Sequence, residues 1–199
     1  MNVSQALSVI FFFIVSLISF SVWAFAAPLF PNEPAMYAGC AIVFLGLGGM
    51  ALLPASGLSG KAALQFCLSF AVAYLAYAFI WSITWFSIPT TFGEVLGSST
   101  GSVAFSAILL RWNRLKISLL VATSVLFLFH TIGYYLGGFA YQAIQGRGPL
   151  GFELNLSAES IRLLARLSWG AGYGLGVGLG ISKILYLSHQ SLAKPSTQI

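Results

Sequence analysis

Charged residues are scarce in this sequence. The 199 residues include nine lysines and arginines and four acids, so that only 7% of the chain is charged, whereas an ordinary soluble domain carries about 25%. Hydrophobic residues make up 58%, and the mean hydropathy is +0.91. This composition excludes a soluble globular domain. The apolar runs also exceed the alternating segments of about 10 residues that build a membrane β-barrel. We therefore predict an all-α, polytopic membrane protein.

Residues that hold metals and cofactors are also few. Cys40 and Cys67 fall inside apolar runs without a C-x-x-C or zinc spacing, which indicates small buried hydrophobic side chains. His130 is the one histidine expected at membrane depth, whereas a membrane haem needs two facing histidines. We expect no metal and no cofactor. The net charge of +5 is too widely spread to mark a nucleic-acid surface, so the expected partner is the lipid bilayer.

The chain reads as a single membrane domain over residues 1–199. A short interfacial helix is predicted over 157–166, where Ser157 can cap the first turn. Residues 24–26 resemble the small-residue cleavage site of a signal peptide, but no basic residue precedes the apolar run; a retained anchor is the expectation and cleavage the alternative. Six membrane spans are predicted, at 7–27, 36–54, 63–88, 92–110, 117–141 and 168–188.

The basic residues predict the orientation. Most of those between and after the spans would share one side of the membrane, which the positive-inside rule makes cytoplasmic. Both termini are then cytoplasmic, and a bacterial inner membrane is the expected location. Arg147, Arg162 and Arg166 fall on the opposite side and break the rule. The residues that follow it are Lys61, Arg111, Arg114, Lys116, Lys183 and Lys194.

Glycine occupies every second position from Gly170 to Gly180. In a helix these glycines form two ridges about 200° apart, and each ridge lets a neighbouring helix approach closely within lipid. We therefore expect a glycine-zipper helix in the centre of the bundle, between two neighbours. The fourth span carries a similar ridge. The predicted packing glycines are Gly93, Gly97, Gly101, Gly170, Gly172, Gly174, Gly176, Gly178 and Gly180.

Ionisable and polar groups at membrane depth are the candidates for binding. Glu94 and Ser98 lie one helical turn apart, as do His130 and Tyr134, so each pair shares a face. Together with Tyr173 they predict a cavity in the outer half of the bundle, which would take a small neutral or weakly polar solute. Two other interpretations stay open: Glu94 can be held by the dipole of its helix N-terminus, and His130 can be a hydrogen-bonding packing device.

These features predict a transporter, a channel or a solute-binding membrane subunit. The alternative is a non-catalytic structural or accessory subunit, whose glycine faces dock on other membrane subunits or on a second copy. A third hypothesis is an intramembrane hydrolase. Residues 97–101 fit G-x-S-x-G, and His130-Thr131-Ile132-Gly133 resembles the second half of the rhomboid protease motif. Rhomboids place another helix between the two halves, whereas here they fall on successive spans, so no catalytic residue is assigned.

Overall fold

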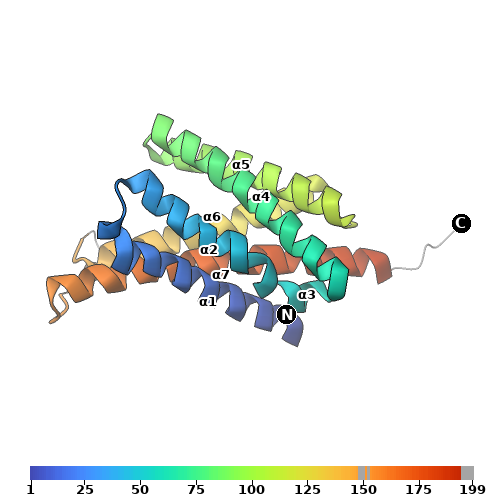
Figure 1. The fold of residues 1–199 in the computed structure, drawn as a ribbon, viewed down its shortest axis with the longest axis horizontal. Coiled ribbons are helices and arrows are strands. Elements are labelled where there is room, and N and C mark those ends of the chain that lie inside the picture. Colours follow the sequence, from blue (N-terminus) through green and yellow to red (C-terminus); the bar gives the residue numbers. More distant parts are fainter. Residues whose placement is uncertain (148–150, 152, 194–199) are drawn as a thin grey trace, which may run out of the picture.

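The computed structural model describes residues 1–147, 151 and 153–193, and every regular element among them is helical. The predicted all-helical class is therefore confirmed. Six long helices account for most of the described residues, and two short ones join α1 to α2 and α2 to α4 (Figure 1). The elements are α1 (Val3–Ala26), η1 (Ala27–Leu29), α2 (Glu33–Ala51), α3 (Leu53–Ser56), α4 (Gly60–Ser87), α5 (Thr91–Asn113), α6 (Leu119–Ile144) and α7 (Ala158–Ala193).

Five of the helical segments in the described part are long and apolar enough to cross a membrane. They are Val3–Leu29, Glu33–Ser56, Gly60–Ser87, Thr91–Asn113 and Leu119–Ile144. They correspond to the first five spans predicted from the sequence. The helix α7 has the length to span, but its glycines contribute little hydropathy and it is not among these five. A bundle of several long apolar helices is compatible with an integral membrane protein.

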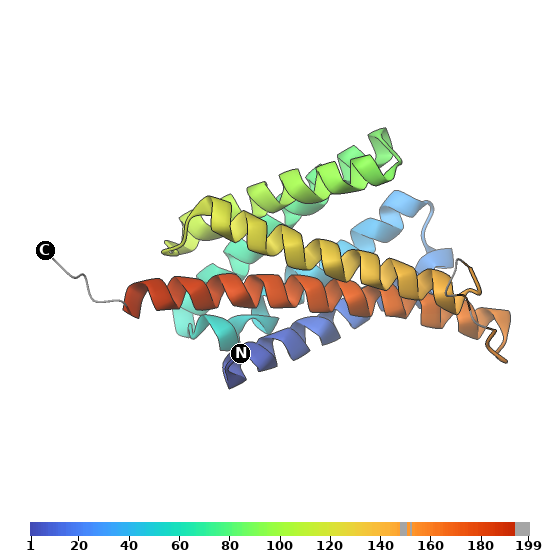
Figure 2. The ribbon, with the colours of Figure 1, turned by 180° about the vertical axis from the view of Figure 1, so that it is seen from behind.

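The long helices form a closed ring. In order around it they are α1, α2, α4, α5, α6 and α7, and α7 returns to pack on α1. Figures 1 and 2 show them roughly aligned, with successive helices running in opposite directions. In this ring α7 is one member, flanked by α1 and α6. The ring brings side chains from all six helices toward one interior.

Helix ends are fixed by local capping. Asn2 accepts a hydrogen bond from the backbone of Gln5 at 2.9 Å, and the Gln5 side chain accepts one from the Asn2 backbone at 2.8 Å; this reciprocal pair starts α1. Asn32 accepts from the Ala35 backbone and starts α2, with Pro34 in the first turn. These two caps fix the first residues of α1 and α2.

The expected interfacial helix and the expected last span belong to one continuous helix. A single helix, α7, runs from Ala158 to Ala193 and includes both the expected interfacial helix at 157–166 and the span at 168–188. Residues 166–168 contain neither proline nor glycine that would end a helix. Ser168 donates to the Ala165 carbonyl at 2.8 Å, a bond within the helix that leaves it continuous. The expected start of the helix is found at Ser157, whose hydroxyl accepts a hydrogen bond from the Ser160 backbone.

The contact between α6 and α7 depends on glycine. A Cβ atom on Gly172 would lie 2.6 Å from the Gly133 carbonyl oxygen and 2.6 Å from the Gly137 amide nitrogen, which are backbone atoms that cannot swing aside. On the other side of α7, a Cβ on Gly170 would lie 2.6 Å from the Cβ of Phe20 in α1. The two sets of glycines on α7 thus lie against the two neighbouring helices. On α5, Gly93, Gly97 and Gly101 lie against the second half of α4 or the residue that follows it.

The two halves of the ring interior differ. At the end that holds the start of α1, large apolar side chains pack together in it: Phe12, Phe66, Phe70, Leu109, Ile181 and Ile184 are all fully buried. At the other end, where α1 finishes and α2 begins, aromatic side chains surround open space. The fold therefore closes one end of the bundle and leaves a cavity in the other.

Candidate functional site

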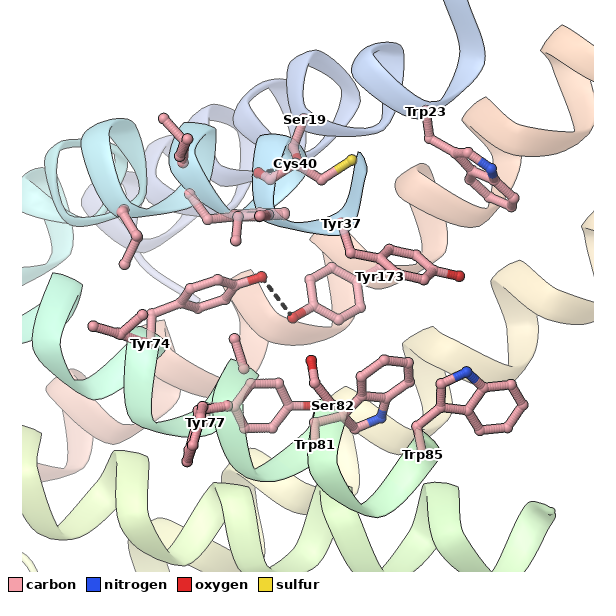
Figure 3. Close-up of a pocket in the computed structure, with 18 of the residues that line it drawn as sticks. Ser19, Trp23, Tyr37, Cys40, Tyr74, Tyr77, Trp81, Ser82, Trp85 and Tyr173 are labelled. Atoms are coloured by element: carbon pink, nitrogen blue, oxygen red, sulfur yellow. Dashed lines mark hydrogen bonds between the residues drawn. The ribbon is translucent and has the colours of Figure 1, made fainter. Parts of the chain in front are cut away.

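A cavity of about 610 Å³ lies between the helices at the end where α1 finishes. Its lining comes from all six long helices and is mainly aromatic and aliphatic (Figure 3). We call it the aromatic cavity. Its aromatic and polar lining residues are Ser19, Phe20, Trp23, Tyr37, Cys40, Phe44, Tyr74, Tyr77, Phe79, Trp81, Ser82, Trp85, Phe86, Glu94, His130, Tyr134, Trp169 and Tyr173. A largely apolar pocket with a few polar groups is typical of a small-molecule site.

The floor of the aromatic cavity is closed by two hydrogen bonds between side chains. The hydroxyl groups of Tyr74 and Tyr173 lie 3.2 Å apart, and Figure 3 shows this bond joining α4 to α7. The Tyr77 hydroxyl lies 2.6 Å from Nε2 of His130. His130 is 2% exposed, so the second bond is fully shielded from water and correspondingly costly to break. Below these bonds the packed half of the bundle begins.

Glu94 is the one carboxylate in the described lining, and it is held by two tyrosines of α6. The Tyr134 hydroxyl donates to Oε1 at 3.0 Å, and the Tyr135 hydroxyl donates to Oε2 at 3.3 Å. Glu94 lies in the first turn of α5, where the helix dipole also favours a negative charge. Both carboxylate oxygens therefore have donors, and the charge faces the cavity without a lysine or arginine among the described lining residues.

Aromatic rings gather around Tyr134. Its ring centroid lies 5.4 Å from that of Trp169, 5.9 Å from that of His130 and 6.4 Å from that of Trp81. Trp81 stacks in turn on Trp85, with 6.0 Å between centroids and 16° between planes. These rings form a continuous wall from α4 across α6 to α7. Their faces carry the negative part of the aromatic quadrupole.

The aromatic cavity is partly open. Four of its lining side chains are exposed: Ile42 on α2, and Leu75, Phe79 and Phe86 on α4. Exposed apolar side chains of this kind suit contact with lipid.

Four of the five candidate binding residues meet in this space. Glu94, His130, Tyr134 and Tyr173 all line the aromatic cavity. Ser98 is buried at 5% exposure and is not among the lining residues. The role of all five in binding stays a prediction.

The sequence interpretation missed the wall that α4 contributes. Tyr74, Tyr77, Trp81 and Trp85 recur at intervals of three and four residues, so they share one helical face. That spacing was a usable signal. A tryptophan near the end of a span is equally well explained by the aromatic belt at the membrane surface, so position alone does not indicate a cavity. In the structure both tryptophans line the cavity.

The serine and histidine of the hydrolase hypothesis are bonded to other groups. Ser99, the middle residue of the G-x-S-x-G pattern, donates to the Leu96 carbonyl of its own helix at 3.0 Å. Nε2 of His130 is engaged by Tyr77. A nucleophile and its base need to be in hydrogen-bond reach of each other, and this arrangement does not provide that pair.

Within the described residues, no group of three histidine, cysteine, aspartate or glutamate side chains is arranged to hold a metal ion. Cys40 and Cys67 are both free thiols. The chemistry that the aromatic cavity offers is thus hydrophobic contact, aromatic faces, a carboxylate and a few hydroxyl groups.

Comparison of the chain with protein-family models, with curated proteins and with solved structures gives no match in any of the three.

Proposed function

We propose that this chain is a six-span integral membrane protein that binds a small, largely apolar solute in the aromatic cavity, as a transporter or as the solute-binding subunit of one. In this proposal α7 is the sixth span, and its glycines allow it to pack tightly between α1 and α6. Both termini are cytoplasmic, and the aromatic cavity lies in the outer half of the bundle.

The observation that carries the proposal is a partly open cavity of about 610 Å³, which has exposed apolar side chains of α2 and α4 in its lining and the bonds Tyr74–Tyr173 and Tyr77–His130 at its floor. Its lining suits a solute that partitions into the bilayer and reaches the site past these exposed side chains. The packed half below the floor favours a binding site over an open channel, because it contains fully buried side chains instead of a continuous path. Passage to the other side would require the bonds of the floor to break.

The accessory-subunit alternative depends on glycine faces that are free to dock elsewhere. In this structure the glycines of α7 contact Phe20, Ser16 and Phe12 of α1 and the backbone of α6. Those faces are therefore occupied by helices of the same chain. This observation favours a solute-binding role over a docking role for α7.

The test uses two small neutral molecules, neopentylbenzene and benzyl alcohol, with protein purified in mild detergent. Each should raise the midpoint temperature of unfolding, because a ligand that binds only the folded state stabilises it. The variant Ala78→Phe places a ring in the cavity lining and should abolish this rise. Ala62→Phe, on an exposed position of the same helix, is the matched control and should keep it. Equal responses in the two variants, or no response in the unmodified protein, would contradict the proposal.

A further inference from the structure

The charged groups in the described lining of the aromatic cavity are all of one sign, which is negative. Glu94 supplies a carboxylate whose two oxygens both accept hydrogen bonds. The described lining contains no lysine or arginine to neutralise it. Glu94 is only partly buried and is one of the residues that line the cavity. In surroundings of low dielectric constant, this charge attracts a cation strongly.

The rings beside Glu94 also suit a cation. Tyr134, which bonds to the Glu94 carboxylate, has its ring next to those of Trp81 and Trp169. Aromatic faces attract a cation placed within about 6 Å of the ring centroid, and tryptophan does so best. One ring at this end already holds such a charge: the Arg166 guanidinium lies 5.1 Å from the centroid of Trp23. Among the described residues, no side-chain cation is found over Trp81, Tyr134 or Trp169.

Two buried nitrogen atoms of the lining residues lack a hydrogen-bond partner within the described part of the chain. They are Nδ1 of His130 and Nε1 of Trp169. Buried polar atoms are nearly always paired in folded proteins. His130 and Trp169 both flank Tyr134. The Trp169 nitrogen only donates hydrogen bonds and so does not pair with a cation. Nδ1 of His130 accepts from an ammonium N–H in the tautomer whose Nε2 donates to the Tyr77 hydroxyl. This acceptor is independent of the charge of Glu94 and belongs to the same cavity lining.

We propose that the solute of the aromatic cavity is a monovalent organic cation, an amine or quaternary ammonium carried on an apolar body. This inference rests on the proposed function and specifies its ligand. The ammonium head lies between the Glu94 carboxylate and the faces of Trp81 and Tyr134. The apolar body extends toward the exposed lining side chains of α2 and α4, which include Ile42, Leu75 and Phe79. An inorganic cation fits less well, because it needs several oxygen ligands.

The experiment uses two probes of the same shape. Benzyltrimethylammonium carries the positive charge, and neopentylbenzene replaces its nitrogen by carbon. Binding of each is measured by tryptophan fluorescence in nanodiscs of zwitterionic phosphatidylcholine, with empty nanodiscs subtracted. For each probe the unmodified protein is compared with Glu94→Gln. This comparison within one probe cancels the partition of that probe into lipid.

The expected result is a loss of affinity for the cation of about tenfold or more in Glu94→Gln, with neopentylbenzene unchanged. Glu159→Gln removes an exposed acid outside the lining and should leave both affinities unchanged. Trp81→Leu keeps the carboxylate but removes an aromatic face. It should lower the affinity for the cation severalfold more than the affinity for the neutral probe. This second variant keeps the test decisive if Glu94→Gln fails to fold.

The outcomes separate the two proposals. If both probes bind and neither variant discriminates between them, the cation inference is overturned while a solute-binding cavity stands. If only the neutral probe binds, the inference is overturned in the same way. If neither probe binds the unmodified protein, the proposed function fails and the inference fails with it.

Discussion

Tyr77 on α4 and His130 on α6 are joined by a bond of 2.6 Å between the tyrosine hydroxyl and Nε2 of the imidazole. In the ring these two helices are separated by α5, so this bond links two non-adjacent walls of the interior. It also separates the aromatic cavity from the packed half of the bundle. The bond therefore serves both stability and the closure of the floor.

Removal of the hydroxyl should destabilise the protein. In Tyr77→Phe, both nitrogen atoms of a histidine that is 2% exposed would lack a partner, and an unpaired buried polar group costs about 1–3 kcal/mol. The free energy of unfolding, measured by titration with a denaturing detergent, should fall by about that amount. Tyr186→Phe is the control, because its hydroxyl bonds only to the exposed Gln190.

The same pair can be tested for coupling. The double variant Tyr77→Phe with His130→Phe removes both polar partners, and should lose less stability than the sum of the two single variants. Strict additivity would mean that the two side chains do not interact, and would remove this bond from the description of the floor.

A single methyl group at the α6–α7 contact should be poorly tolerated. In Gly172→Ala the new Cβ would meet backbone atoms of Gly133 and Gly137 at 2.6 Å, so the helices must separate. Overpacking of this kind costs about 1–3 kcal/mol or more, and should lower the midpoint temperature of unfolding. Gly46→Ala is the matched control, since nothing lies within 4 Å of its added Cβ; there the higher helix propensity of alanine should leave stability equal or slightly raised. Similar behaviour of the two variants would contradict the close approach of the helices.

The sequence predicted most of the elements but only half of the site. Apolar runs of sufficient length locate five helices, because a span needs about 20 apolar residues. The last helix was predicted as two elements that meet at residues 166–168, since its polar first turns and its glycine-rich segment have different compositions, whereas the backbone only requires that nothing break the helix. The composition changes at residues 166–168, but the backbone hydrogen bonds of the helix continue through them.

The prediction of the site was limited for a related reason, because it used only the spacing of residues within single helices. Glu94 and His130 were found because ionisable groups are rare at membrane depth. The bond from Glu94 to Tyr134 spans 40 residues, and that from His130 to Tyr77 spans 53. Pairings at such distances depend on the order of helices around the ring, which helical spacing does not specify. The α4 face of Tyr74, Tyr77, Trp81 and Trp85 was visible as a stripe, but its direction toward a cavity was not.

Arg166 should be a cap for α1. Its Nη1 donates to the Trp23 carbonyl at 2.8 Å and lies 3.5 Å from that of Ala24, and these carbonyls belong to the last turn of α1, where no intrahelical donor remains. Arg166→Gln should lower the free energy of unfolding by about 1–2 kcal/mol and speed protease cleavage within residues 27–32. Arg162→Gln, one turn earlier and exposed, should change neither measurement. Equal cleavage in the two variants would contradict the capping role.

The orientation in the membrane gives the last prediction. If the basic residues at 111–116 face the cytoplasm, alkaline phosphatase fused after Leu115 should be inactive in a bacterial host, and green fluorescent protein fused to the C-terminus should fluoresce. Alkaline phosphatase fused after Arg147 should be active, because α6 crosses between these two points. Activity after Leu115 with none after Arg147 would invert the orientation. The aromatic cavity would then face the cytoplasm, and its solute would reach it from the inner leaflet.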